Sequence, residues 1–222
     1  LLQVLNDHRE DLYPLLGDAF RGEDFCKIDL STHQRAFDVA SVQTYAGLNE
    51  YIQSQLKKHN AKVGVGGYLE KRLIYQQSGN FKNSDEDRNI HLGVDYWCAA
   101  GTKIFAPLDS IVHSYQYNTA YLDYGATIIL QHELAGHVFY TLYGHLTLAS
   151  LQPLFKGMKI SKGVPFTATG HQDENGGWVP HLHFQIIKNM QGREGDYPGV
   201  ASAQQLKSHV ENCPDPEVFF VY

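Results

Sequence analysis

Residues 126–143 have the sequence ATIILQHELAGHVFYTLY, in which two runs rich in β-branched and aromatic residues flank a short central segment. Runs of this composition favour β-strands. The segment Glu133–Gly136 between them contains glycine, which is common in the tight turns that join adjacent strands. This stretch therefore predicts an antiparallel hairpin formed by Ala126–His132 and Val138–Tyr143.

Further runs of the same kind lie on both sides of this hairpin, at Lys103–Ala106, Ser110–Tyr115 and Leu182–Ile187. They are short and are separated by turn residues, which is typical of antiparallel sheets. We therefore expect a mainly β fold with antiparallel sheets, arranged as an open sandwich or barrel-like structure, over residues 68–190.

The first 67 residues have a different pattern. Leu48, Tyr51, Ile52 and Leu56 recur at helical spacing in a segment without proline, which predicts a helix over Phe37–Lys58. Glycines at 64, 66 and 67 exclude a longer helix, and because they follow no predicted strand and open no predicted helix they do not form a nucleotide-binding loop. Residues 1–67 are thus predicted to be a mostly helical N-terminal extension.

The last segment, residues 191–222, contains Pro198, Pro214 and Pro216 and shows no sustained periodicity. Proline interrupts both helices and sheets. We therefore expect an irregular C-terminal tail that packs on the β domain.

Composition limits the classes of partner. The 222 residues include 18 Lys and Arg against 24 Asp and Glu, a net charge of −6, so the chain lacks the overall positive field that attracts nucleic acid. No run approaches the ~18 apolar residues of a membrane-spanning helix, so no transmembrane segment is predicted in this chain. The composition leaves the oligomeric state open. The three cysteines, at 26, 98 and 213, indicate neither a disulfide framework nor a thiolate zinc site.

Histidine is frequent, and the spacing of a few histidines is informative. In His91-Leu92-Gly93-Val94-Asp95 the polar residues alternate with apolar ones, so on a strand His91, Gly93 and Asp95 point the same way. Glycine at the centre leaves room for an ion that both side chains could contact. On its own, this pentapeptide is also consistent with a strand whose His and Asp hydrogen-bond locally.

A second group, His181-Leu182-His183-Phe184, places both imidazoles on one face of a strand and apolar residues on the other. Such a pair can bind a metal, or divide into one ligand and one acid/base group, and two surface histidines on an edge strand are the alternative. A third, Tyr143-Gly144-His145-Leu146, contains a single histidine at the end of a β-run.

One apparent metal motif is excluded. His132-Glu133-Leu134-Ala135-Gly136-His137 is similar to the helical zinc motif HExxH, but its second histidine comes one residue late. A spacing of five does not return to the same helix face, and the surrounding sequence predicts a hairpin.

Together the three histidine groups resemble the lysostaphin-type (LytM-like) family of zinc metalloendopeptidases, which cut peptidoglycan cross-bridges or stem peptides. The family pattern is HxGxD, a His after a strand, and HxH, which here are His91-Leu92-Gly93-Val94-Asp95, Tyr143-Gly144-His145-Leu146 and His181-Leu182-His183-Phe184. Gly101–Pro107 and Asn175–Gly177 are also similar to the family. The resemblance covers about residues 68–190.

The resemblance implies one Zn²⁺ bound by His91, Asp95 and His183, with His145 and His181 as unliganded catalytic histidines. Two imidazoles and one carboxylate leave a fourth tetrahedral position for water, as in catalytic zinc sites. Zinc lowers the pKa of bound water to about 7, and the two free histidines can take and return its proton. The residues do not indicate which of the two is the base.

The residues around the motifs suggest where substrate binds. Trp178-Val179-Pro180 precedes the last motif, and the segment Tyr115–Tyr124 is rich in tyrosine. We expect Tyr117, Tyr121 and Trp178 to contact substrate, although these aromatic residues are equally typical of a sheet surface or a core.

The predicted function is zinc-dependent hydrolysis of peptide bonds, with peptide or peptidoglycan as substrate and no nucleic acid as partner. A peptidase acting on non-wall peptides, and a catalytically inactive, binding-only relative that regulates a cell-wall hydrolase, are the alternatives. The resemblance implies a location in the cell envelope, periplasmic or extracellular. Since no leader is visible at Leu1, a cytoplasmic location is the alternative.

Overall fold

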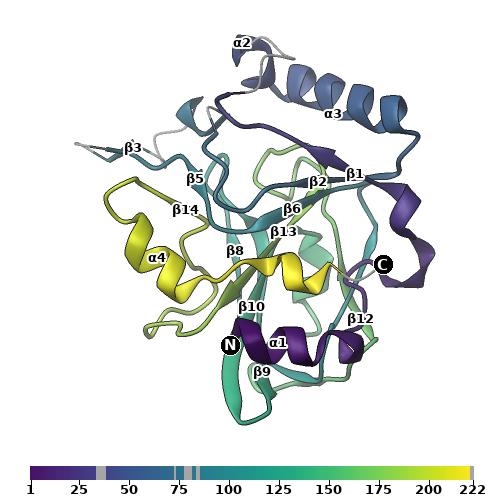
Figure 1. Cartoon of the computed structure of the whole chain (residues 1–222), viewed down its shortest axis with the longest axis vertical. Coiled ribbons are helices and arrows are strands. Elements are labelled where there is room, and N and C mark those ends of the chain that lie inside the picture. The colour runs from purple at the N-terminus through teal and green to yellow at the C-terminus, as the bar shows by residue number, and fades with distance from the viewer. Residues whose placement is uncertain (34–38, 73, 78–81, 84–85, 221–222) are drawn as a thin grey trace.

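The computed structural model describes residues 1–33, 39–72, 74–77, 82–83 and 86–220. Strands dominate it, and the principal sheet is open rather than closed (Figure 1). Across the described residues this sheet has the order β1 (Phe25–Ile28), β2 (Val63–Gly66), β6 (Val94–Trp97), β13 (His181–Ile187), β10 (His137–Leu146), β9 (Gly125–Leu134), β8 (Ser110–Asn118) and β11 (Lys159–Ile160). The mainly β, antiparallel fold class predicted from the sequence is confirmed.

Three two-stranded sheets accompany the principal one. They pair β7 (Lys103–Phe105) with β12 (Pro165–Ala168), β5 (Ile90–His91) with β14 (Val200–Ala201), and β3 (Lys82–Asn83) with β4 (Glu86–Asp87). All are antiparallel. Among the described strands of the principal sheet, only β1 and β2 pair in parallel.

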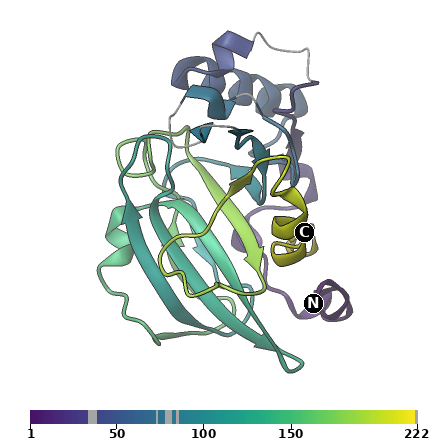
Figure 2. The same ribbon diagram turned by 90° about the vertical axis from the view of Figure 1, so that its left-hand side faces the viewer.

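The hairpin predicted from residues 126–143 is confirmed. β9 and β10 pair in antiparallel register from His137 opposite Leu134 to Tyr143 opposite Ile128. Ala135 and Gly136 connect them with φ values of 48° and 77°. Two successive positive φ angles match the twist of the flanking strands, which is why glycine suits this turn. The turn lies at the end of the molecule opposite α3 (Figure 2).

The helix predicted over Phe37–Lys58 is divided into two. α2 covers Val39–Val42 and α3 covers Tyr45–His59, while residues 37 and 38 lie outside the described residues. The division occurs because Thr44 has an extended backbone and its hydroxyl accepts the amide of Gly47, which caps a new helix. α3 then buries its apolar face, Leu48, Tyr51, Ile52 and Leu56, beside β1 and β2 (Figure 1).

The two terminal segments contain more structure than the sequence indicates. The N-terminal extension supplies β1 and β2 to the principal sheet, in addition to α1 (Leu2–Asp7) and three 3₁₀ turns, Arg9–Asp11, Gly17–Ala19 and Gly22–Asp24. The C-terminal tail forms β14, α4 (Leu206–Asn212) and a 3₁₀ turn at Pro216–Phe219, so it is not wholly irregular. Further 3₁₀ turns lie at Ile74–Gln77 and Leu148–Leu151.

Among the described residues, no helix combines the length and the apolarity required to cross a membrane.

The largest apolar cluster packs against one face of the sheet at its centre. Every residue of β13 is buried, and Leu182, Phe184 and Ile186 join the largest apolar cluster. The alternate residues of the same strand, among them His181 and His183, face the other side. β13 therefore separates a hydrophobic core from a buried polar site.

Candidate metal centre

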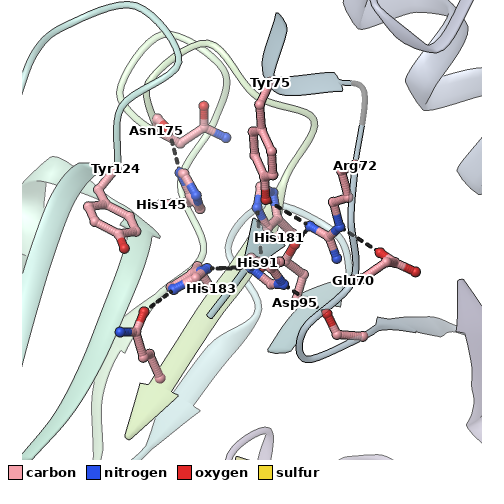
Figure 3. Close-up of polar contacts among 12 residues, drawn as sticks. Glu70, Arg72, Tyr75, His91, Asp95, Tyr124, His145, Asn175, His181 and His183 are labelled. Carbon is pink, nitrogen blue, oxygen red and sulfur yellow. Dashed lines mark hydrogen bonds and ion pairs between the residues drawn. The ribbon is translucent and has the colours of Figure 1, made fainter. Parts of the chain in front are cut away.

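Strand register brings the three predicted metal ligands together. β13 pairs with β6 so that His183 lies opposite Asp95, and His91 ends β5 immediately before β6. His91 Nε2 is 2.9 Å from His183 Nδ1 and 3.2 Å from Asp95 Oδ1, and His183 Nδ1 is 3.2 Å from the same carboxylate oxygen (Figure 3). All three side chains are buried. Two nitrogens and one oxygen thus converge on one point.

Hydrogen bonds on the far side of each imidazole determine which nitrogen faces the centre. His91 Nδ1 donates to the carbonyl of Gly67 at 3.0 Å, which leaves Nε2 as the inward atom. His183 Nε2 donates to Gln185 Oε1 at 3.0 Å, which leaves Nδ1 inward. The Gln185 amide is itself oriented, because its Nε2 donates to the carbonyl of Pro198. Metal-binding histidines characteristically donate their second N–H in this way.

The donor set fits a metal ion such as zinc. In the neutral form, both inward nitrogens carry lone pairs that face each other and a carboxylate oxygen, an arrangement that a shared metal ion would satisfy. For ligands about 2.0–2.1 Å from zinc, tetrahedral geometry separates donor atoms by about 3.3 Å, close to the observed separations. Three protein ligands leave a fourth position for water or substrate.

Gly93 has a role different from the one expected. The space beside it does not accommodate the ion, because a Cβ atom at Gly93 would lie 2.6 Å from His183 Cε1. Glycine is therefore required so that the imidazole of His183 can reach the centre.

Burial and charge set the protonation of the ligands. Burial, assisted by the nearby Arg72 guanidinium, lowers the pKa of His91 to about 4, so this imidazole is neutral at neutral pH. Burial alone would raise the carboxyl pKa of Asp95, but His91 and Arg72 hold it well below its usual range. The site therefore presents a neutral imidazole and an ionised carboxylate, as metal binding requires.

Arg72 holds the outer oxygen of Asp95. Its Nη1 donates to Asp95 Oδ2 at 2.5 Å and to Tyr75 Oη at 3.1 Å, and its Nε donates to Glu70 Oε2 at 2.5 Å. The arginine side chain is 1% exposed and Glu70 is 8% exposed. Glu70 also accepts the amide of Leu30. Because Oδ2 is engaged by Arg72, only Oδ1 faces the histidines, so the carboxylate is oriented to act as a single-oxygen ligand.

The two predicted catalytic histidines lie beside this centre but are not among its three converging donors. Their ring centroids are 4.2 Å apart, and His181 Nε2 is 3.9 Å from Asp95 Oδ1. Nδ1 of His145 donates to the Asn175 carbonyl at 2.8 Å, and Nδ1 of His181 donates to the Val179 carbonyl at 2.7 Å. Both neutral rings therefore direct an Nε2 lone pair into the site.

Burial also keeps both rings neutral. It lowers the pKa of His181 to about 4, and burial together with the neighbouring His181 lowers the pKa of His145 well below the usual histidine value. The indole of Trp97 stacks on His181 with centroids 4.0 Å apart, which fixes the ring plane. A neutral imidazole with a free lone pair can accept a proton at neutral pH.

His145 occupies an irregular position in its strand. The pairing of β9 with β10 shifts between Tyr143 and Leu146, and His145 has a φ of 63°, which is rare for a residue with a side chain. Its amide donates to the Tyr124 carbonyl at 2.7 Å. Bulges and backbone strain of this kind are over-represented at functional sites, where they redirect a side chain.

One family model matches the part of the chain that contains this site. The family model named Peptidase family M23 matches residues 89–194. This segment contains the four histidines and the one aspartate predicted for the site. These residues, just under half of the chain, are similar to peptidase family M23 and are called the M23 segment below.

Several solved structures are similar to parts of this chain. A zinc-containing peptidase from Vibrio cholerae is 24% identical with a TM-score of 0.36, over 47% of this chain and 29% of that one. Csd3 from Helicobacter pylori is 25% identical with a TM-score of 0.35, over 56% of this chain and 32% of that one. The catalytic domain of lysostaphin from Staphylococcus simulans is 21% identical with a TM-score of 0.35, over 61% of this chain and 96% of that one. Among the curated proteins, none matches this chain.

Part of the site lies outside the M23 segment. Glu70, Arg72 and Tyr75 precede residue 89, and sequence reasoning missed all three because no local spacing links them to the histidine motifs. Gln185 was also missed, although strand alternation continues from His181 and His183 to this residue and could have identified it.

A cleft of about 490 Å³ opens onto the M23 site. Its lining includes His91, His145 and His183, and it also includes Tyr75, Tyr124 and Trp178. Trp178, one of the three residues expected to contact substrate, is thus part of the cleft wall. Tyr117 and Tyr121 do not line this cleft, since both are exposed and the ring of Tyr121 lies over Gly177. From the tyrosine-rich segment it is Tyr124 that reaches the site, with its ring centroid 5.1 Å from that of His183.

Proposed function

We propose that this chain is a zinc-dependent endopeptidase that hydrolyses peptide bonds in peptidoglycan cross-bridges or stem peptides. The observation that carries the proposal is the convergence of His91 Nε2, His183 Nδ1 and Asp95 Oδ1 within 3.2 Å of one another. Outward hydrogen bonds leave both inward nitrogens unprotonated. The match of residues 89–194 to peptidase family M23 supports the same class of reaction.

In this proposal His91, Asp95 and His183 hold one Zn²⁺. The ion would supply a water of lowered pKa and would polarise the scissile carbonyl. One of the neutral histidines, His145 or His181, takes the proton of the attacking water on its Nε2 atom. Transfer of this proton from the same ring to the departing amine then completes the cleavage.

The cleft supports a peptide as the substrate. It is large enough for several residues and combines the aromatic walls of Tyr75, Tyr124 and Trp178 with polar groups. Wall peptides are favoured because M23 includes lysostaphin among its solved members. A substrate in the cell wall would place this chain in the cell envelope, periplasmic or extracellular. An inactive, binding-only protein is disfavoured, because all five expected site residues are present and arranged around one centre.

The test is digestion of purified peptidoglycan, followed by mass spectrometry of the soluble products with and without a zinc chelator. We expect fragments with new amino termini that disappear on chelation and return when Zn²⁺ is restored. Chelator-insensitive release would exclude the metal mechanism. Release from free peptides alone would move the substrate to non-wall peptides, and no release from either substrate by zinc-loaded protein would support the inactive alternative.

A further inference from the structure

A buried glutamine, Gln185, lies between the metal centre and the C-terminal tail. It is 0% exposed and follows His183 by two residues on β13, so both side chains lie on the same face of the strand. Its Oε1 atom is 3.0 Å from His183 Nε2. Its Nε2 atom donates to the Pro198 carbonyl at 3.1 Å and to the Cys213 sulfur at 3.3 Å. One amide thus connects a proposed metal ligand to two residues that lie beyond the M23 segment.

The two tail contacts fix which way the Gln185 amide points. The carbonyl oxygen of Pro198 can only accept a hydrogen bond, and the sulfur of Cys213 can accept a weak one, so both contacts suit the NH₂ group. Turning the amide over would place Oε1 against the Pro198 oxygen, and two buried acceptors would then face each other without a proton between them. The observed orientation therefore keeps Oε1, which can only accept, towards His183.

The tail is itself held in place around Cys213. This residue is 0% exposed at the end of α4, where its amide donates to the His209 carbonyl at 2.6 Å and its carbonyl accepts the hydroxyl of Tyr68 at 2.5 Å. The carbonyl of the preceding residue, Asn212, accepts the amide of Lys188, which directly follows β13, at 2.8 Å. These backbone bonds limit movement of the sulfur relative to β13.

The orientation of the amide influences which nitrogen of His183 carries the proton. A neutral imidazole has one N–H, and this ring has an acceptor on each side, because Asp95 Oδ1 is 3.2 Å from Nδ1 and Gln185 Oε1 is 3.0 Å from Nε2. A proton on Nδ1 would remove the lone pair that a metal needs there and would leave the Nε2 lone pair facing Oε1. Since Oε1 cannot donate, the fixed amide favours the proton on Nε2 and leaves Nδ1 free.

We propose that Gln185 is a positioning residue for the metal ligand His183, and that Pro198 and Cys213 hold its amide so that Nδ1 remains available to zinc. The inference rests on the proposed function and extends its metal centre to a part of the chain that supplies none of the three proposed ligands. Loss of an outer hydrogen-bond partner of a metal-bound histidine lowers metal affinity about 10- to 100-fold. The tail therefore contributes to zinc affinity without contacting the ion.

The first test needs no substitution in the protein that is measured. Long-range ¹H–¹⁵N correlation spectra of the metal-free full chain distinguish protonated from unprotonated ring nitrogens, and comparison with His183→Gln identifies the signals of His183. We expect its proton on Nε2. A proton on Nδ1 in the unmodified chain would overturn the inference, whatever the zinc affinity.

Substitutions at Gln185 measure how much the amide contributes. Gln185→Met has a similar length but no acceptor, so we expect zinc affinity to fall about 10- to 100-fold and the His183 proton to move to Nδ1. Gln185→Glu restores an acceptor and should keep the proton on Nε2. Zinc affinity is measured by competition with a chelator of known affinity, on protein shown to be folded by circular dichroism. Unchanged affinity in Gln185→Met, with the proton still on Nε2, would overturn the positioning role.

A second set of variants tests the tail. Cys213→Ala removes one of the two acceptors of the Gln185 NH₂ group, and we expect zinc affinity to fall about two- to tenfold, since one neutral hydrogen bond contributes a factor of this size. Cys213→Ser keeps an acceptor and should restore most of the affinity. Cys26→Ala removes another buried thiol, on β1, and is the matched control that should bind zinc as the unmodified chain does. Equal affinities in Cys213→Ala and Cys26→Ala would overturn the role of the tail.

The outcomes separate this inference from the proposed function, because none of these measurements requires cleavage. If the unmodified chain binds no zinc, the metal mechanism fails, and the position of the His183 proton in the unmodified chain and in Gln185→Met decides the role of Gln185. If cleavage is zinc-dependent but Gln185→Met changes neither the proton position nor the zinc affinity, the peptidase proposal stands and this inference fails.

Discussion

The two ends of the cleft differ in how completely the protein satisfies its own polar groups. At the metal end, Asp95 is 2% exposed and both of its oxygens are engaged, and each histidine has one nitrogen fixed by a protein acceptor. The other end is lined by Arg88, Asp123, Arg193 and Asp196. There, Arg193 is exposed and Asp196 is only partly buried, and neither forms an ion pair with another described residue. The comparison shows that the groups proposed for chemistry are held in place by protein partners, whereas Arg193 and Asp196 are not fixed by ion pairs among the described residues.

The largest expected effect comes from breaking the metal end at its centre. His183→Ala removes one of three donors, so we expect loss of bound zinc and a fall in peptidase activity of about 10⁴-fold or more, since groups that act as a unit lose nearly all their effect together. Elemental analysis of the purified variant measures the metal. His137→Ala, at an exposed position on β10, is the control and should retain zinc. Full zinc occupancy in His183→Ala would refute the ligand assignment.

The next largest effect distinguishes a loss of catalysis from a loss of bound zinc at the metal end of the cleft. His181→Ala and His145→Ala should each retain zinc but lose about 10²- to 10⁴-fold in kcat, because a positioned acid/base group contributes a factor of this size. Zinc content and kcat are measured on the same preparations. Retention of full turnover in either variant would exclude that histidine from proton transfer.

A smaller effect is expected from loosening the support of Asp95. Arg72→Met removes the donor to Asp95 Oδ2, and we expect zinc affinity to fall about 10- to 100-fold, as for other residues that orient a metal ligand. The measurement is zinc competition against a chelator of known affinity, on protein shown to be folded by circular dichroism.

A purely structural role for Arg72 makes a different prediction. Arg72→Met also leaves Glu70 buried without its cation, which destabilises the fold. Arg72→Met combined with Glu70→Gln should restore much of that stability while zinc affinity remains low. Recovery of zinc affinity in the double variant would contradict the positioning role.

The smallest effect tests whether burial alone explains the neutral histidines of the metal end. His132 is buried outside the cleft, where its Nε2 lies 2.7 Å from Thr141 Oγ1, and burial lowers its pKa to about 4. In the unfolded chain His132 is protonated below about pH 6.5, whereas in the folded protein it stays neutral down to about pH 4. Burial of the neutral ring therefore makes its full contribution to the free energy of unfolding above about pH 6.5. It is lost as the pH falls from about 6.5 towards 4, by up to about 1.4 kcal/mol per pH unit.

Urea unfolding of the metal-free protein between about pH 5 and 7 measures this slope. His132→Gln should make the slope shallower, and His137→Gln, at an exposed position, should leave it unchanged. A slope that His132→Gln does not alter would mean that His132 titrates normally in the folded protein.

Much of the fold followed from local pattern. The β9–β10 hairpin and the strands around it were predictable because their apolar runs and turn residues are local features. The break between α2 and α3 was not predicted, since a single threonine cap at Thr44 outweighs helical periodicity there. The strands β1 and β2 were also missed. β2 contains two glycines, a poor strand signal, and it is stabilised by pairing with β6 on one side and β1 on the other.

The candidate site was predictable only as far as its motifs extend. His91, Asp95, His145, His181 and His183 are brought together as their spacing and family resemblance indicated. The residues that support them are distributed over the chain, and tertiary contacts rather than spacing select them. Tyr117 and Tyr121 illustrate the same limit, because sequence identified an aromatic segment but could not determine that Tyr124 is the member that reaches the cleft.

The sheet that carries the metal centre is completed by the N-terminal extension. β6, the strand of Asp95, hydrogen-bonds to β13 on one side and to β2 on the other, and β1 covers β2 in turn. Excising residues 1–67 would convert β6 into a bare edge whose amides and carbonyls invite pairing with a second molecule. In this chain the M23 segment therefore depends on the N-terminal strands, and truncation at the boundary of the family match would yield an aggregation-prone fragment.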